Sequence, residues 1–144
     1  MIETPPQNAI STIYRVPYAD TDQMGVVYYG NYLTFFERGR NELMRATSVT
    51  YQEMENDGAM LPVIEAHVTY RSPARYDDLL TITAWLESTS RVKMKICCVV
   101  TRGDDVLASG YTVHACISTK TLRPVRIPEY LQNLVTAGEQ TENA

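Results

Sequence analysis

The chain has 144 residues, of which 44% are hydrophobic and 21% charged, so it is long enough for one globular domain with a sizeable core. Its formal net charge of -4 argues against binding to nucleic acid or to an anionic membrane surface. The 3 cysteines and 2 histidines form neither an even disulfide set nor a spacing typical of zinc ligands, so we expect no metal and no cofactor.

The two ends of the chain are polar and are expected to be flexible. Residues 1–9 include Pro5 and Pro6, and residues 136–144 are rich in Gly, Glu, Thr, Gln and Asn. The N-terminus lacks the basic region and apolar core of a signal peptide, and no apolar run approaches the roughly 20 residues that cross a bilayer. The sequence therefore predicts a cytoplasmic protein with one domain over residues 10–135 and no membrane-spanning segment.

The first half of this domain is predicted to contain a strand, a loop and a long helix. Residues 10–18 have the β-branched and aromatic content of a strand, and a loop over residues 19–28 follows. From residue 29 or 31 to about residue 47, apolar side chains recur every three or four positions, which predicts an amphipathic helix of about four turns. Its candidate N-cap is Asn31, and Gly39 would let this helix approach another backbone closely.

After a short second helix that we expect to end at residue 56, the hydrophobic period changes to two. The alternating segments are residues 61–71, 79–88, 92–101 and 106–119. In the last of them, the apolar set consists of Leu107, Ser109, Tyr111, Val113, Ala115 and Ile117. Turn residues at 88–91 and 102–105 join consecutive segments. The pattern predicts an α+β fold in which an antiparallel sheet with one buried face curls around the long helix.

Asp20 and Asp22 lie in the loop before this helix. At a helix start, backbone N–H groups are unpaired and the helix dipole is positive. A carboxylate that faces free amide donors is a plausible arrangement for acyl chemistry. Asp20 is expected to support the loop by accepting backbone N–H bonds, as Asp does in turns, and Gly25 is expected at a tight bend.

Three segments of the sequence carry a resemblance to a known family. They are Tyr18-Ala-Asp-Thr-Asp-Gln-Met-Gly-Val-Val-Tyr-Tyr-Gly-Asn-Tyr, Phe36-Glu-Arg-Gly-Arg and Tyr70-Arg-Ser-Pro-Ala-Arg-Tyr-Asp-Asp-Leu-Leu. In this order they resemble the acyl-CoA thioesterases of the 4-hydroxybenzoyl-CoA thioesterase type, over about residues 12 to 130. The resemblance implies a hotdog fold, in which a five-stranded antiparallel sheet wraps around one long central helix. It also implies a homo-oligomer, a dimer or tetramer whose sheets join edge to edge, with sites between protomers.

The resemblance also implies the roles of the residues in the first segment. Asp22, the second aspartate of an Asp-x-Asp-x-x-Gly motif, would be the catalytic carboxylate, either as a nucleophile or as a general base that activates water. Backbone N–H groups at Tyr29 and Gly30 would stabilise the oxyanion. Several relatives have a histidine where this chain has Tyr29, so no imidazole is expected to take part here.

Coenzyme A carries phosphates, so an acyl-CoA enzyme needs a local basic patch even when its net charge is negative. By the same resemblance, the candidates for phosphate binding are Arg91 and Lys93, which open the third alternating segment, and Arg123, which follows the fourth. Arg91 and Arg123 match best. The alternative interpretation is that each is a solvated surface charge.

The sequence leaves three functions in competition. The leading hypothesis is hydrolysis of an acyl-CoA thioester to a free acid and coenzyme A. The first alternative is cleavage of an acyl group from a carrier protein, which would give less weight to Arg91 and Arg123. The second is a non-catalytic acyl-CoA-binding protein, against which Asp22 argues. The acyl group is not encoded, because the candidate pocket residues could equally be core or interface. These residues are Tyr28, Tyr29, Tyr32, Met60 and Trp85.

Overall fold

The computed structural model describes residues 4–135. The helices are η1 (Tyr18–Asp20), α1 (Asn31–Arg45) and α2 (Tyr51–Asn56). The strands are β1 (Ile10–Arg15), β2 (Ala59–Met60), β3 (Val63–Tyr70), β4 (Leu79–Thr89), β5 (Lys93–Arg102), β6 (Asp105–Ala115) and β7 (Ile117–Ser118). Residues 129–135 are helical. Of the two ends expected to be flexible, residues 1–3 and 136–144 lie outside the described residues.

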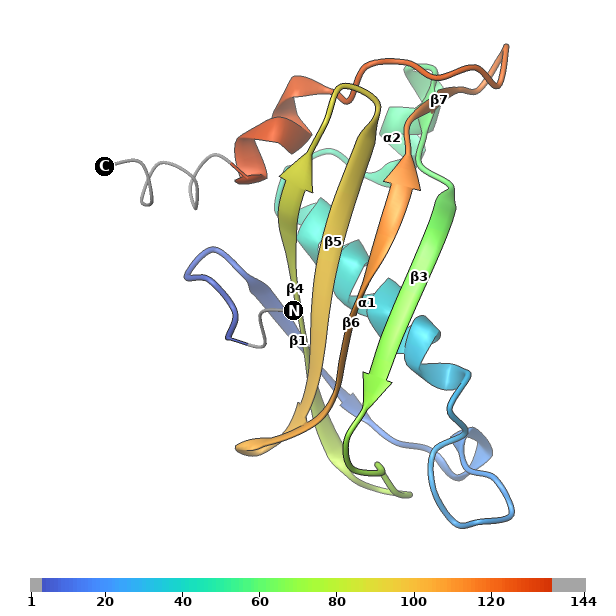
Figure 1. Cartoon of the computed structure of the whole chain (residues 1–144), viewed down its shortest axis with the longest axis vertical. Coiled ribbons are helices and arrows are strands. Elements are labelled where there is room, and N and C mark those ends of the chain that lie inside the picture. The colour runs from blue at the N-terminus through green and yellow to red at the C-terminus, as the bar shows by residue number, and fades with distance from the viewer. Residues whose placement is uncertain (1–3, 136–144) are drawn as a thin grey trace.

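Five antiparallel strands form the main sheet, in the order β1-β4-β5-β6-β3, and β2 pairs with β7 separately. The helix α1 crosses one face of this sheet and contacts β1, β3, β4 and β5 (Figure 1). Two tight turns join β4 to β5 and β5 to β6 at the positions that the sequence predicted. The expected α+β fold, a five-stranded antiparallel sheet around one long helix, is confirmed.

The amphipathic helix is confirmed, and Gly39 explains how close it lies to the sheet. A Cβ atom at Gly39 would lie 3.0 Å from Ile82 Cγ2 and 3.2 Å from Ala84 Cβ, so a larger residue would push α1 away from β4. The predicted N-cap is wrong. The residue at the cap position is Gly30, with no side-chain cap bond, and Asn31 Nδ2 instead donates to the Asp20 carbonyl oxygen at 2.9 Å.

The alternation predicted for β4 and β5 is confirmed on the face that α1 covers. The buried residues there are Leu80, Ile82, Ala84, Leu86, Met94, Ile96, Cys98 and Val100. The apolar set predicted for β6 is wrong as a buried face, because Gly110 pairs with Cys98 and His114 pairs with Met94. A Cβ atom at Gly110 would clash with the His67 carbonyl oxygen of β3 and lie 2.7 Å from Phe36 Cε2 of α1, so only a residue without a side chain fits there. Hydrophobicity therefore points to the wrong face of β6.

The opposite face of the sheet carries a smaller buried cluster, so the expectation of a single buried face is incomplete. Trp85, Cys97 and Val99 are at most 4% exposed and pack with Tyr111 and Val106. Trp85 is therefore part of this cluster and lies outside any pocket at the helix start.

Candidate active site

Backbone hydrogen bonds fix the loop between β1 and α1. Val16 N donates to the Asp78 carbonyl oxygen at 2.9 Å, and Val27 N donates to the Ala74 carbonyl oxygen at 2.8 Å. Both acceptors lie in the connection between β3 and β4. The loop is thereby bonded to this connection near its beginning and near its end, and the residues between these two points have a defined position.

Asp20 holds this loop through one oxygen of its carboxylate and through its backbone carbonyl. Its Oδ2 accepts a hydrogen bond from the Tyr14 hydroxyl at 2.5 Å. Its backbone carbonyl oxygen accepts from Tyr28 N and from Asn31 Nδ2, both at 2.9 Å. Burial and the Asp20 carboxylate raise the pKa of Tyr14 to about 12, so that hydroxyl stays a donor. Asp20 supports the loop as expected, but its carboxylate bonds to a phenol where backbone N–H groups were expected.

Asp22 sits in a tight turn that leaves one of its carboxylate oxygens available. Gly25 N donates to the Asp22 carbonyl oxygen and Met24 N to Asp22 Oδ1, both at 2.9 Å. Gly25 has a φ of 79°, which confirms the tight bend expected at this glycine. The turn therefore orients the carboxylate through Oδ1, and Oδ2 has no hydrogen-bond partner among the described residues.

Asp22 and Tyr29 border the same cavity, which has a volume of about 260 Å³. The cavity is also lined by the aromatic residues Tyr32 and Tyr70, by the apolar Pro73, and by the polar residues Arg71 and Ser72. Complete small-molecule sites in proteins commonly enclose about 300–1,000 Å³. The structure thus brings the predicted carboxylate and the predicted helix-start residue together at a cavity of modest size.

The sequence reasoning missed one wall of this cavity. That wall is residues 70–73, the end of β3 and the residues that follow it. The available signal was the segment that begins at Tyr70, which contributed to the family resemblance but received no role. Of the residues proposed for the pocket, Tyr29 and Tyr32 line it, whereas Tyr28 and Met60 do not.

Two backbone donors at the start of α1 are unpaired. Asn31 N bonds to the Tyr28 carbonyl oxygen and Tyr32 N to the Tyr29 carbonyl oxygen, which closes the first turn. Within the described chain, the N–H groups of Tyr29 and Gly30 have no acceptor. They lie at the positive end of a helix of 15 residues. A developing negative charge in the adjoining cavity would be stabilised by such donors.

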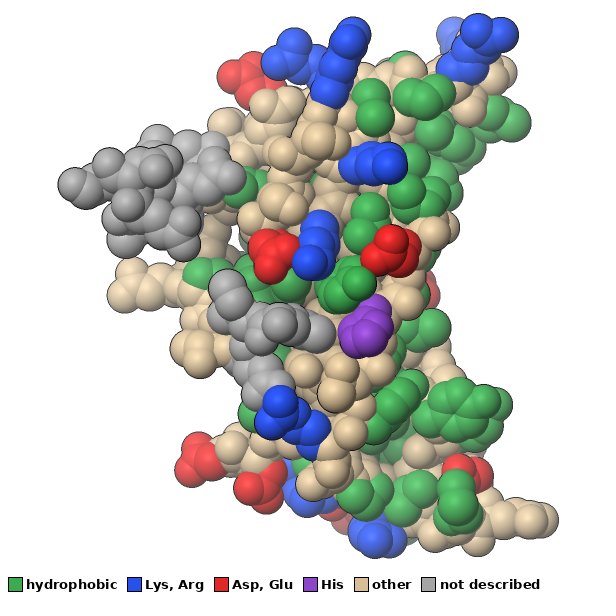
Figure 2. Space-filling model, viewed as in Figure 1, with side chains coloured by type: hydrophobic (Ala, Val, Ile, Leu, Met, Phe, Trp, Pro, Cys, Tyr) green, Lys and Arg blue, Asp and Glu red, His purple; other side chains and the backbone are tan. Residues whose placement is uncertain are grey.

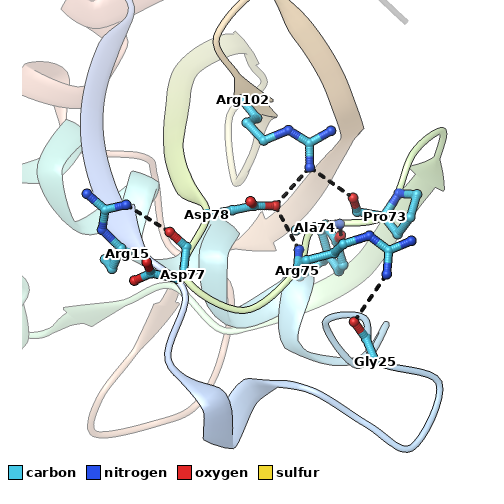
Figure 3. A network of polar contacts seen from close by, with 9 residues as sticks. Arg15, Gly25, Pro73, Ala74, Arg75, Asp77, Asp78 and Arg102 are labelled. Atoms are coloured by element: carbon cyan, nitrogen blue, oxygen red, sulfur yellow. Dashed lines mark hydrogen bonds and ion pairs between the residues drawn. The ribbon is translucent and has the colours of Figure 1, made fainter.

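A network of polar contacts braces the connection between β3 and β4 beside this cavity (Figure 3). Asp78 Oδ2 accepts from Arg75 N and from Arg102 Nη1, both at 2.8 Å. Arg102 Nη1 also donates to the Pro73 carbonyl oxygen at 3.3 Å, and Arg75 Nη1 donates to the Gly25 carbonyl oxygen at 3.4 Å. Burial by itself would raise the pKa of Asp78, but these Arg75 and Arg102 contacts outweigh it and lower that pKa. The network links the cavity wall to the Asp22 turn.

The predicted phosphate-binding residues do not line the Asp22 cavity, and they do not all border one hollow. Arg91, Lys93 and Arg123 are all exposed. Arg91 borders a hollow with Arg126, a residue that the sequence prediction did not select, and neither Lys93 nor Arg123 lines that hollow. Lys and Arg side chains project at the end of the molecule that holds the β4–β5 turn (Figure 2). Arg126 lies 35 positions after Arg91, so only folding reveals that they are neighbours.

These basic residues are far from Asp22 within one chain. The Asp22 loop is bonded to the connection that precedes β4, whereas Arg91 follows the other end of this strand. A strand of 11 residues spans about 33 Å. Figure 1 shows the two parts at opposite ends of the sheet. A single protomer therefore does not bring the two halves of the predicted site together.

Other chemistries find little support in the described residues. Burial raises the pKa values of the Cys97 and Cys98 thiols to about 12 each, so neither is an effective nucleophile at neutral pH. Residues 4–135 contain no group of three or more side chains placed to hold a metal ion. In the same range, no helix combines the length and apolarity needed to cross a bilayer.

A five-stranded antiparallel sheet wrapped around one long helix is the hotdog fold, and structural neighbours of this chain include hotdog thioesterases. The family model of the thioesterase-like superfamily matches residues 16–135. The chain therefore belongs to the thioesterase-like superfamily. This confirms the expected family resemblance, the hotdog fold and, at the level of the family, the enzyme class of thioester hydrolases.

Relatives of similar length support this membership. The putative acyl-CoA thioesterase YneP of Bacillus subtilis is 27% identical over 129 residues, which cover 89% of this chain and 94% of the relative. The acyl-CoA thioesterase YbgC of Haemophilus influenzae is 30% identical over 123 residues, which cover 85% and 90%. The structure of the DHNA-CoA thioesterase from Staphylococcus aureus has a TM-score of 0.81 at 28% identity, and the match covers 94% of this chain and 91% of that one.

Proposed function

We propose that this protein hydrolyses an acyl-CoA thioester to a free carboxylic acid and coenzyme A, with Asp22 as the catalytic carboxylate. The observation that carries the proposal is the shared cavity at the start of α1. Among residues 4–135, Asp22 Oδ2 accepts no hydrogen bond, Tyr29 borders the same cavity, and the N–H groups of Tyr29 and Gly30 have no acceptor. Relatives that carry the name acyl-CoA thioesterase support the choice of substrate class.

Two routes lead from this geometry to the products. In the first, Asp22 attacks the thioester carbonyl, the C–S bond breaks, and water then hydrolyses the mixed anhydride. In the second, Asp22 takes a proton from a water molecule that attacks the same carbon. In both, the coenzyme A thiolate leaves and is protonated, and one water molecule is consumed. The N–H groups of Tyr29 and Gly30 would stabilise the negative charge on the carbonyl oxygen in either route.

The complete site is proposed to form between protomers of a homodimer, which can pair further into a tetramer. The edge strand β3 supports this assembly, because Val63 and Ile64 are 47% and 51% exposed. An exposed apolar edge strand is a surface on which a second sheet pairs readily. The separation of about 33 Å along β4 also favours a partner that supplies the second half of the site.

The basic end of the sheet is proposed to bind the phosphates of coenzyme A, with Arg91, Lys93 and Arg123 in that role and Arg126 added to them. The hollow that Arg91 and Arg126 share favours coenzyme A over a carrier-protein arm, because that arm lacks the nucleotide phosphates. The test has two alternative outcomes. One is hydrolysis of the thioester on an acyl carrier protein, and the other is binding of acyl-CoA without catalysis.

The test uses the purified protein, a panel of aromatic and aliphatic acyl-CoA substrates, and a reagent that detects free thiol. Asp22→Asn should lower kcat roughly 10³-fold, since it removes the nucleophile or base without changing the size of the side chain. Asp20→Asn is the matched control, because an amide oxygen still accepts from Tyr14, and its kcat should change less than about threefold.

Full activity of Asp22→Asn would contradict the assignment of this residue. Equal rates on an acyl carrier protein that persist in Arg91→Ala would favour the carrier-protein alternative. Saturable acyl-CoA binding without release of thiol would favour the non-catalytic alternative.

A further inference from the structure

The strand β3 ends at Tyr70, and the phenol of this residue lies against the start of α1. The Tyr70 hydroxyl donates a hydrogen bond of 2.9 Å to the Tyr29 carbonyl oxygen. The Tyr70 ring meets the Tyr32 ring edge-on, with centroids 5.1 Å apart and an interplanar angle of 89°. It meets the Tyr29 ring at 6.3 Å and 88°. Two aromatic contacts and one hydrogen bond thus define where the hydroxyl lies.

The backbone also holds Tyr70 in place. Tyr70 pairs with Ala108 on β6. Directly after it, Arg71 N and Ser72 N both donate to the Leu107 carbonyl oxygen, at 2.8 and 3.2 Å. The side chain therefore projects from the rigid end of a paired strand, which positions groups better than a free loop does.

The bond to Tyr29 acts on the peptide unit that also contains the N–H of Gly30. In a planar trans peptide the C=O and N–H groups point in opposite directions, so a donor that fixes the carbonyl also fixes the N–H. The Tyr29 carbonyl oxygen accepts a second bond, from Tyr32 N at 3.3 Å. Donors on the carbonyl also polarise the peptide and strengthen the hydrogen bond that its N–H can donate.

We infer that Tyr70 is a positioning residue for the oxyanion site, one that orients and polarises the Gly30 N–H through its bond to the Tyr29 carbonyl oxygen. This inference rests on the proposed thioesterase function. Burial raises the pKa of Tyr70, so its hydroxyl remains a donor through the neutral range. The role differs from that of Asp22, which would react with the substrate directly.

The first test is Tyr70→Phe, which keeps the ring and removes only the hydroxyl. The kcat on a good acyl-CoA substrate should fall about 3- to 10-fold while KM stays unchanged, because the interaction strengthens only as charge develops on the carbonyl oxygen. Tyr76→Phe is the matched control, since Tyr76 is an exposed tyrosine in the connection after β3 and its ring contacts Tyr18. Its kcat should equal that of the wild type.

The second test measures the chemical environment of the Gly30 amide directly. The Gly30 amide resonances in a ¹⁵N–¹H spectrum should shift in Tyr70→Phe and stay in place in Tyr76→Phe. A thermal unfolding curve of each variant shows whether a loss of activity reflects a loss of stability.

The outcomes separate this inference from the proposed function. A lower kcat with unchanged KM and a shifted Gly30 resonance would support the positioning role. If Tyr70→Phe has the kcat of the wild type while Asp22→Asn, assayed in the same way, is inactive, the inference is overturned and the proposed function stands. A lower kcat with an unmoved Gly30 resonance would also overturn it. A wild-type protein that releases no thiol from any acyl-CoA would overturn both.

Discussion

The two ends of the main sheet are built differently. At one end, hydrogen bonds hold the Asp22 turn, and Asp20 bonds through both its side chain and its backbone. At the other end, Arg91 and Arg126 are exposed side chains around an open hollow. The two ends of the sheet therefore suit different chemical tasks. Stabilising a transition state requires donors that are already in place, whereas binding a phosphate requires only positive charge within reach.

Reversing the charge of the hollow that Arg91 and Arg126 border should have the largest effect on substrate binding. Arg91→Glu combined with Arg126→Glu puts negative charge where the phosphates of coenzyme A would bind. The KM for an acyl-CoA should rise about 10- to 100-fold, while kcat should change less than about threefold. Steady-state kinetics on an acyl-CoA and on the matching acyl-pantetheine, which lacks the nucleotide, measure the effect.

The control for charge reversal is Arg45→Glu on α1, an exposed arginine that pairs with Glu42. Its KM should stay near the wild-type value. A KM that rises equally for acyl-CoA and acyl-pantetheine in the double variant would show that the hollow does not bind the nucleotide.

Gly30→Ala tests whether the other end depends on fixed geometry. The added Cβ would lie 2.8 Å from Tyr28 Cε2, so the Tyr28 ring or the Gly30 peptide must move. We expect kcat to fall about 10-fold with little change in KM, since an oxyanion donor misplaced by a few tenths of an ångström loses much of its effect. Kinetics and a thermal melt measure this, and an unchanged kcat would argue against a role for the Gly30 N–H.

Asp20→Ala tests what holds the Asp22 turn in place. It removes the partner of the Tyr14 hydroxyl, a partly buried bond of 2.5 Å, and should lower the free energy of unfolding by about 1 kcal/mol. Asp22→Asn keeps an oxygen for Met24 N and should lower it by less than half as much. Urea unfolding of the two variants compares them. Equal losses would mean that Asp20 is no more structural than Asp22.

Acidification should weaken the packing around His114 before it affects Asp78 near the Asp22 turn, and this is the smallest effect. Burial lowers the pKa of His114; the bond from its Nδ1 to the Leu61 carbonyl oxygen opposes that shift, and the charge of Arg40 adds to it. A histidine with a lowered folded pKa contributes stability that is complete above its unfolded pKa of about 6.5 and is lost as pH falls. Asp78, whose folded pKa is also lowered, loses its contribution only below about 3.9.

Urea unfolding between pH 7.5 and pH 5 measures this difference. Stability of the wild type should decline below about pH 6.5, and the decline should be smaller in His114→Gln, which has no titrating group there. Equal slopes in the two proteins would show that another group controls the pH dependence.

The helix, the strands and the loop that contains Asp22 were predictable because their signals are local. Apolar residues at helical spacing predicted α1, and alternation predicted β4 and β5. The failures came from contacts between distant segments. Phe36 of α1 fills the space above Gly110, so the inner face of β6 looks polar in the sequence. Asn31 looks like a helix cap until the Asp20 carbonyl oxygen competes for its side chain.

The fold class, the family and the place of the Asp22 turn could be predicted from the chain, because hydrophobic period, turn residues and a contiguous motif are properties of neighbouring residues. The folded structure was needed to show that Tyr70 reaches the Tyr29 carbonyl oxygen, that Arg91 has Arg126 beside it, and that Asp22 lies at the far end of the sheet from both arginines. These relations join residues more than 30 positions apart. They depend on strand register and on how closely α1 packs against the sheet, which no local pattern specifies.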